Sequence, residues 1–463
     1  MENTDTFMGH PKGLFVLFFT EMWERFSYYG MRAILVLYIV SQSTGDNPGL
    51  GWETKDALAL YGWYTMLVYV MSIPGGFIAD KLIGQKKAVF IGGLTLCAGH
   101  GILAVEEMWA FYTGLGLIIL GVGLLKPNIS TMVGGLYDKG DIRRDKGFTI
   151  FYIGINIGAF LSSLVVGVVG ETYGWHYGFG LAGIGMAFGQ LVFMMGQKHL
   201  TTVGNFLAKS PDPELQAAAN KPLSKVEKDR VSVLLLSFLI VIVFWGAFEQ
   251  AGGLMNIYTM EKTNRVLGFT LPIIGNEIPA SVFQSLNAAF IIIFGTAIAG
   301  YWAKRKLKSK ESSSLFKMAI GTMIMGTGFL FMTAASAQFE SNGSSAMYWL
   351  VFAYLFHTIG ELCASPVALS FITKLAPVKY ASIMMGVYFA MTGFGNKLAG
   401  LLGESASDLG EYTIFTGIAI FCVAFGFLIL AFLKKLKTLT HGAEDLHVEP
   451  AHFSEDIEVE TTH

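Results

Sequence analysis

The chain has 463 residues, of which 53% are apolar and only 14% are charged. Soluble domains carry about 25% charged residues, so this chain has too few ionic groups to cover a water-facing surface. The net charge of −2 argues against nucleic acid as a main partner. All three cysteines lie inside apolar segments and imply no disulfide framework. The first apolar segment is too long and too charged for a cleavable signal peptide.

Apolar stretches of about 20 residues recur along the chain, and each is long enough to cross a hydrocarbon core of about 30 Å. This repetition predicts an all-α polytopic membrane protein with twelve transmembrane helices. The expected spans are 14–41, 55–79, 87–105, 109–134, 147–169, 175–197, 231–258, 281–303, 314–336, 347–374, 380–404 and 413–433.

The basic residues between these spans predict the orientation. If the amino terminus is inside, 25 of the 32 Lys and Arg residues fall on that same side. Only Lys55, Lys262 and Arg265 fall on the opposite side. Cytoplasmic loops of membrane proteins are enriched in Lys and Arg, so we expect both termini in the cytoplasm. The expected location is the plasma membrane, as a bacterial inner-membrane protein.

A long polar connector at 198–230 divides the chain into two six-helix halves. The expected organisation is an N-terminal arm at 1–13, a first bundle at 14–197, this cytoplasmic linker, a second bundle at 231–436 and an acidic tail at 437–463. The final stretch, 441–463, has no Lys or Arg, and we expect it to be a disordered, solvated tail. Two such halves place a substrate site near the midplane at their interface.

Eight ionisable residues lie well inside apolar spans, although each would cost about 2.5–3.5 kcal/mol at a lipid-facing helix centre. They must therefore line a watery cavity or pair within the bundle. The eight are Glu21, Glu24, Arg25, Arg32, Lys126, Glu249, Glu361 and Lys397.

Span 1 has the densest charge pattern. Glu21, Arg25, Tyr28 and Arg32 are spaced four, three and four residues apart, which places them along one helix face. Glu24 lies on the flank of that face. The alternative is an ion-pair ladder with a purely structural role. A structural helix would not need these charges, so we favour a functional stripe.

Other spans combine a charge with a helix break. Lys126 precedes Pro127, and Glu361 shares a face with Ser365 just before Pro366. Glu249 follows an unbroken apolar run, where a lone carboxyl group is a natural proton carrier. Neutral hydrogen-bonding groups at membrane depth can join such a site or hold helices together. These are Tyr64, Tyr69, Tyr152, Asn156 and Asn287.

Several motifs resemble one family. Glu21-Met-Trp-Glu24-Arg25-Phe-Ser-Tyr28-Tyr29-Gly30 is similar to the ExxERFxYYG signature of the proton-dependent oligopeptide transporters, a branch of the major facilitator superfamily. Phe151-Tyr152-Ile-Gly-Ile-Asn156-Ile-Gly158 resembles its FYxxINxG signature. The segment from Gly76 to Gly84 resembles the superfamily's loop motif between spans 2 and 3. The resemblance covers 8–436 and implies the major facilitator fold.

The resemblance implies roles for individual residues. Arg25 and Lys126 would meet a peptide carboxylate, and Glu361 with Asn156 and Asn287 would meet its amino terminus. Glu21, Glu24, Glu249 and Glu361 would couple protons. The pairs Arg32–Glu249 and Lys126–Glu361 would form and break between the halves. The remaining expected substrate-binding residues are Tyr28, Tyr29, Tyr64, Tyr69, Ser365 and Tyr388. Many relatives have a Trp where this chain has Tyr388, and Lys397 has no counterpart to which a role can be assigned.

Together these features predict a proton-coupled symporter that imports di- and tripeptides by alternating access and acts as a monomer. Apart from protons we expect no cofactor or metal, and no ATP, because no phosphate-binding GxxxxGK[ST] loop is present. Three alternatives remain open: another cargo such as nitrate or a drug, a membrane peptide sensor that does not transport, and an intramembrane enzyme. The enzyme is the weakest alternative, since no metal-ligand pair or nucleophile–base motif falls within the spans.

Overall fold

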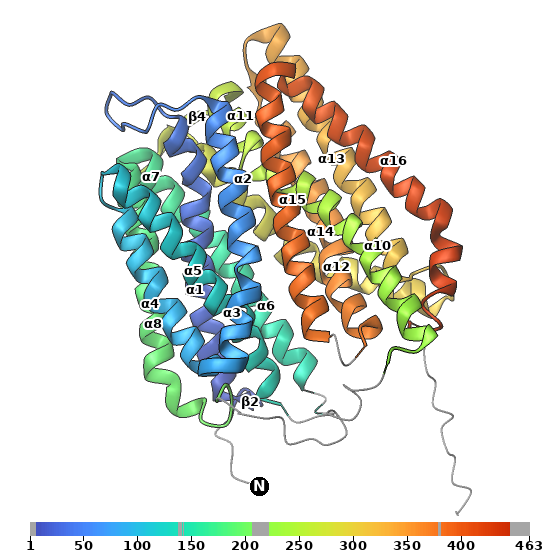
Figure 1. Cartoon of the computed structure of the whole chain (residues 1–463). Helices are drawn as coiled ribbons and strands as arrows, with labels where there is room; N and C mark the ends of the chain where they lie inside the picture. The colour runs from blue at the N-terminus through green and yellow to red at the C-terminus, as the bar shows by residue number, and fades with distance from the viewer. Residues whose placement is uncertain (1–5, 138–140, 142, 206–221, 378–380, 445–463) are drawn as a thin grey trace, which may run out of the picture.

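The computed structural model describes residues 6–137, 141, 143–205, 222–377 and 381–444. Twelve long helical segments run through these residues in two groups of six (Figure 1). The described ends of the chain lie at one end of the molecule, which we call the terminal face (Figure 1). The opposite end, where β4 lies, is called the far face.

The first six segments form the N-terminal half. Three of them are interrupted by irregular turns or end in one, so a single span comprises more than one element. The elements are α1 (Lys12–Val40), α2 (Thr54–Val70), α3 (Ser72–Ile78), η1 (Ala79–Ile83), α4 (Gln85–Leu103), α5 (Met108–Gly135), α6 (Arg144–Ser162), η2 (Ser163–Gly167), α7 (Val168–Tyr173), α8 (Trp175–Gly196) and η3 (Gln197–His199).

The other six segments form the C-terminal half. Each of its first two segments contains a short 3-10 turn. The elements are α10 (Lys225–Phe248), η4 (Glu249–Ala251), α11 (Leu254–Lys262), η5 (Ala280–Gln284), α12 (Ser285–Leu307), α13 (Ser314–Asn342), α14 (Tyr348–Leu375), α15 (Ala381–Leu409) and α16 (Glu411–Thr438).

In the described chain, short strands occur in the segments that precede or connect the helices. The antiparallel pair β4 (Val266–Leu271) and β5 (Gly275–Glu277) forms a hairpin on the far face, which the helix-only prediction missed. The other two-stranded pairs are β1 (Thr6–Phe7) with β2 (His10–Pro11) and β3 (Thr263–Asn264) with β6 (Ser345–Ala346). All three are too small to alter the helical architecture.

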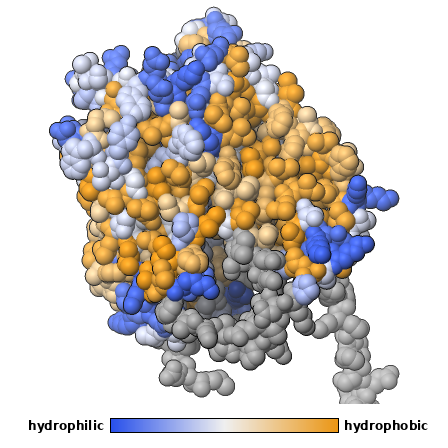
Figure 2. Space-filling view, in the orientation of Figure 1, coloured by the Kyte–Doolittle hydropathy of each residue, from blue (hydrophilic) through white to orange (hydrophobic). Residues whose placement is uncertain are grey.

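The surface confirms a membrane protein. Nine of the described helical segments are long and apolar enough to span a membrane, and charged or polar residues lower the hydropathy of α1, α4 and α15. Figure 2 shows an apolar band across the visible face of the molecule with hydrophilic patches toward both ends. Large apolar side chains on the described helices, such as Trp109 and Ile420, are more than half exposed, as expected for helices in contact with lipid. The predicted all-α polytopic fold is confirmed.

The expected span edges agree with the structure to within six residues at both the starts and the ends, and most helices continue past the apolar stretches. The largest shift at a start is at α10, which begins at Lys225 inside the predicted linker because Ser224 and Glu227 form a capping box. Linker residues 206–221 and tail residues 445–463 lie outside the described residues.

Helices of the two halves meet where α1 contacts α11, where α2 and α3 contact α15, and where α6 contacts α12. The α2–α15 contact is close because glycines face each other. A Cβ atom built on Gly400 would lie only 2.8 Å from the Gly62 Cα. Small residues let membrane helices approach where the lipid provides no hydrophobic driving force for packing. The interface therefore contains backbone-to-backbone contact, and the buried polar groups lie beside it.

Candidate functional site

The stripe on α1 forms a buried charge cluster. The Arg25 Nε lies 3.0 Å from Glu21 Oε1 and also pairs with Glu24. All three side chains are almost fully buried. The Arg25 guanidinium carbon lies 5.7 Å from the ring centroids of both Tyr28 and Tyr29, a distance at which a cation is attracted to a ring face. Two acids surround one arginine, so the stripe is more than a one-to-one ladder.

Lys126 lies one residue before the proline in α5. Its Nζ lies 3.7 Å from the centroid of the Tyr69 ring in the same half and 5.8 Å from that of Phe389 in α15. Pro127 removes one backbone donor from the helix, and Asn128 donates to the Leu124 carbonyl oxygen at 2.7 Å. Within the described chain no carboxylate lies within ion-pair distance of the Lys126 ammonium. This half therefore presents a half-buried cation that is held only by aromatic faces.

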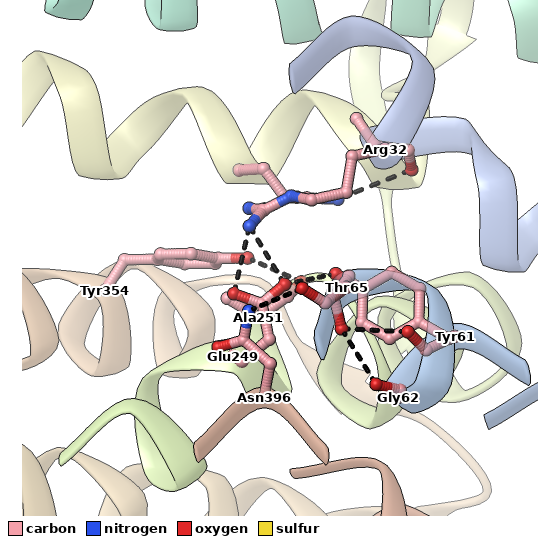
Figure 3. Close-up of polar contacts among 10 residues, drawn as sticks. Arg32, Tyr61, Gly62, Thr65, Glu249, Ala251, Tyr354 and Asn396 are labelled. Carbon is pink, nitrogen blue, oxygen red and sulfur yellow. Dashed lines mark hydrogen bonds and ion pairs between the residues drawn. The ribbon is translucent and has the colours of Figure 1, made fainter. Parts of the chain in front are cut away.

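Arg32 joins the halves through a second cluster, drawn in Figure 3. Its Nη1 donates to both Glu249 oxygens, at 2.9 and 3.0 Å. Tyr61 of α2 donates its hydroxyl hydrogen to Glu249 Oε1 at 2.5 Å. Figure 3 shows side chains from α1 and α2 converging with groups from η4, α14 and α15. The expected Arg32–Glu249 pair is thus formed in this conformation.

The position of Glu249 follows from a break in its span. The α-helix α10 ends at Phe248, and η4 tightens into a 3-10 turn before the Gly252–Gly253 pair. Gln250 donates to the Ala399 carbonyl oxygen of α15 at 3.0 Å, which fixes this turn against the neighbouring helix. Glu249 is the first residue of this turn, and from there its carboxylate contacts Arg32.

Glu361 is the acid of the other half. Its Oε2 accepts a hydrogen bond of 2.7 Å from Asn287 Nδ2, which also donates to the Thr358 hydroxyl at 3.1 Å. Within the described chain Glu361 has no cationic partner within ion-pair distance, and the expected Lys126–Glu361 pair is not formed in this conformation. Across the interface, Tyr152 lies within electrostatic range of Glu361 and is 41% exposed. This acid therefore has only neutral hydrogen-bond partners.

The remaining predicted site residues differ in their burial and in their hydrogen-bond partners. Asn156 donates to the Tyr152 carbonyl oxygen at 2.9 Å and makes no recorded contact with Glu361. Tyr64 is buried, and its hydroxyl has no hydrogen-bond partner among the described residues. Tyr388 is buried, whereas Ser365 is half-buried on α14. Lys397 pairs with Glu404 at 3.1 Å in its own helix.

Sequence reasoning overlooked some partners. Tyr61 was not singled out, although it precedes Thr65 and Tyr69 by four and eight residues on one face of span 2. Thr358 and Gln284 were also missed as groups near Glu361 and Arg32; Gln284 accepts from Arg32 at 3.5 Å. Neutral residues in an apolar span give no signal of their own, because they are equally common as structural hydrogen-bonding groups.

Most of the chain matches a known family model. The POT family model matches residues 86–212 and 216–414. This chain belongs to the POT family. The resemblance that its motifs indicated is confirmed, and with it the major facilitator fold.

Characterised and uncharacterised relatives resemble this POT chain over nearly its whole length. It is 35% identical to the uncharacterized transporter YclF of Bacillus subtilis, over 94% of this chain and 96% of the relative. It is 33% identical to a di-/tripeptide transporter of Lactococcus lactis subsp. cremoris, over 94% and 97% of the two chains. A crystal structure of a peptide transporter POT in complex with sulfate superposes with a TM-score of 0.86 at 34% identity and the same coverage.

Proposed function

We propose that this POT family member is a proton-coupled symporter that imports di- and tripeptides by alternating access. One observation carries the proposal. Lys126 in the N-terminal half has no carboxylate partner, and Glu361 in the C-terminal half has no cationic partner, within the described chain. A dipeptide is a zwitterion that supplies one charge of each sign, so it complements both groups at once.

The proposed binding mode places the peptide carboxylate near Arg25 and Lys126 and its ammonium near Glu361 and Asn287. Burying a charge without a partner is costly, so each substrate terminus would neutralise a charge that the empty site leaves uncompensated. The half-buried tyrosines Tyr29 and Tyr69 would line the pocket between these ends. The name of the Lactococcus relative, a di-/tripeptide transporter, supports this substrate class.

Proton coupling is proposed to use the acids that hold the halves together or surround Arg25. Protonation of Glu249 would remove the negative charge that Arg32 contacts and so weaken the closed far face. A proton can shift a two-state equilibrium only if it binds the two states with different affinity, and a buried ion pair provides that difference. Glu21 and Glu24, which share Arg25, are the other candidate proton carriers.

The orientation is part of the proposal. The sequence assigns 25 basic residues to the side of the termini and three to the opposite side, so the terminal face would be cytoplasmic in the bacterial inner membrane. We propose that the chain acts as a monomer, without ATP, metal or another cofactor, and catalyses no covalent reaction.

The test is uptake of labelled dialanine by proteoliposomes containing the purified protein, with and without an inward proton gradient. We expect accumulation above equilibrium only with the gradient, and its loss on adding a protonophore. Competition by a panel of peptides, nitrate and single amino acids then defines the cargo. Binding of dialanine without accumulation would contradict transport and favour a sensor, and competition by nitrate but not by peptides would contradict the substrate class.

A further inference from the structure

Another contact between the halves lies on the far face, apart from the charge clusters around Arg25, Arg32 and Glu361. Glu171, in α7 of the N-terminal half, accepts hydrogen bonds from residues of the C-terminal half. Its Oε2 accepts from the Ala280 backbone N–H at 2.8 Å. Its Oε1 accepts from the Ser281 backbone N–H at 2.7 Å and from the Ser281 hydroxyl at 2.5 Å. Both carboxylate oxygens are therefore occupied across the interface.

The donors are well suited to a carboxylate. Ala280 and Ser281 begin the helical segment that continues through η5 and α12 to Leu307, and the first N–H groups of such a segment have no acceptor within the helix. Aligned peptide dipoles also give this end a partial positive charge. No Lys or Arg forms an ion pair with Glu171 within the described residues, so these donors are its counterpart.

The backbone on the N-terminal side of this contact holds Glu171 close to Ser281. The π-helical turn η2 ends at Gly167, and a Cβ atom built on that glycine would lie 2.3 Å from the Ser281 hydroxyl oxygen. Any larger residue would therefore crowd the Ser281 side chain that donates to Glu171. On the N-terminal side, Asn47 donates to the carbonyl oxygens of Gly170 and Glu171, at 2.9 and 3.3 Å, and fixes the end of α7.

This contact is independent of the substrate site. It joins the α6–α7 span to the start of α12, whereas Arg32 and Glu249 join α1 to the α10–α11 span. Neither Glu171 nor Ser281 contacts a residue of the charge clusters around Arg25 or Glu361 in the described structure. Opening of the far face must separate these two spans and so break the three hydrogen bonds.

We propose that Glu171, Ala280 and Ser281 form a far-face latch, which sets how often the far face opens without contributing to peptide binding. Glu171 is thus a positioning residue for the transport cycle, and this role rests on the alternating access proposed above. The Arg32–Glu249 pair contacts substrate-site groups through Tyr29, whereas the latch responds only to the relative position of the halves.

The test measures the distance between two spin labels on the far face by pulsed electron paramagnetic resonance, without peptide. Labels are attached at Tyr177→Cys and Leu409→Cys, which are exposed in the N- and C-terminal halves, in a background lacking the half-buried Cys97. The variants are Glu171→Gln and Ser281→Ala. In Glu171→Gln an amide NH2 group replaces one of the two acceptor oxygens and faces the backbone N–H donors. Ser281→Ala removes the hydroxyl donor. The matched control is Glu106→Gln, an exposed acid on the same face.

We expect the ratio of long to short label distances to rise by about tenfold in Glu171→Gln, the effect of losing one hydrogen bond to a charged group. A smaller rise is expected in Ser281→Ala, and no change in Glu106→Gln. Identical distance distributions in Glu171→Gln and Glu106→Gln would overturn the latch. If Glu171→Gln does not fold, Ser281→Ala decides by the same comparison.

The distance measurement also separates this proposal from the transport proposal. If the wild-type protein fails to accumulate dialanine, the symporter proposal fails while the distances still report on the latch. If the protein transports dialanine but the distances do not change in either latch variant, the latch fails and the symporter proposal stands.

Discussion

Buried charges in this protein are stabilised in different ways, and the differences separate their roles. Arg25 pairs with two acids, Arg32 pairs with one acid that also accepts from a tyrosine hydroxyl, and Lys126 lies against aromatic rings without an ion pair among the described residues. Glu361 has neutral hydrogen-bond donors alone. A buried charge with an ion-pair partner stabilises one conformation. A buried charge without such a partner is stabilised when a ligand of opposite charge binds beside it. The lack of an ion-pair partner at Lys126 and Glu361 supports the proposal that these two groups bind the substrate termini.

The first prediction concerns Glu361→Gln. The amide keeps the size of the side chain but removes the negative charge that a substrate ammonium would contact. Losing one partner of a buried charge pair costs about 2–5 kcal/mol, so uptake of dialanine should fall by at least about tenfold. Uptake is measured in proteoliposomes under a proton gradient at a subsaturating dialanine concentration.

The control variant is Glu340→Gln, an exposed acid in the same half, which should transport like the wild type. Competition by N-acetyl-dialanine, which lacks the ammonium, should be similar in the wild type and in Glu361→Gln. Full dialanine uptake by Glu361→Gln would contradict the assigned contact.

At the scale of helices, the sequence predicted where spans lie better than how they bend. Hydropathy and loop charge placed all twelve segments, because lipid selects strongly for length and apolarity. The breaks at Glu249 and in the α6–α7 span were not predicted, since a 3-10 or π turn depends on neighbours in space. The same holds for Tyr61 and for the latch at Glu171, whose partners are more than a hundred residues away in the chain.

The second prediction concerns the contact between α2 and α15. In Gly400→Ala the new methyl group would meet the Gly62 Cα and the Leu58 carbonyl oxygen at about 3 Å, and backbone atoms cannot move aside like a flexible side chain. Such overpacking should lower the free energy of unfolding by about 1–3 kcal/mol. The measurement is thermal or denaturant unfolding in one detergent.

Gly417→Ala in α16 is the matched control, because a Cβ atom there meets nothing within 4 Å. Alanine has the higher helix propensity, so this variant should be unchanged or more stable by up to about 1 kcal/mol. Equal stability of the two variants would show that the α2–α15 contact can relax without cost.

The polar contacts that join the two halves are distributed unevenly between the far face and the terminal face. Among the described residues, the ion pairs that join the halves, Arg32–Glu249 and the exposed Lys55–Asp408, lie toward the far face. The hydrogen bonds of Glu171 to Ala280 and Ser281 lie there too. Toward the terminal face, Lys126 and Glu361 remain apart. This is the arrangement expected of a carrier that is closed on the far face. In the alternating access proposed above, these contacts break as Lys126 and Glu361 approach.

The last prediction tests whether Glu249 couples protons to that alternation. Glu249→Gln keeps an oxygen that can accept from Arg32 and Tyr61 but carries no charge, so it mimics a permanently protonated carboxyl group. A carrier that can no longer release this proton cannot use the gradient, and accumulation of dialanine should fall to the level seen without one. Counterflow of labelled for unlabelled peptide needs no net proton movement and should be retained. Both are measured in the same proteoliposomes, with Glu340→Gln as the control. Equal loss of both activities would make Glu249 a binding or structural residue, and undiminished accumulation would remove it from the coupling mechanism.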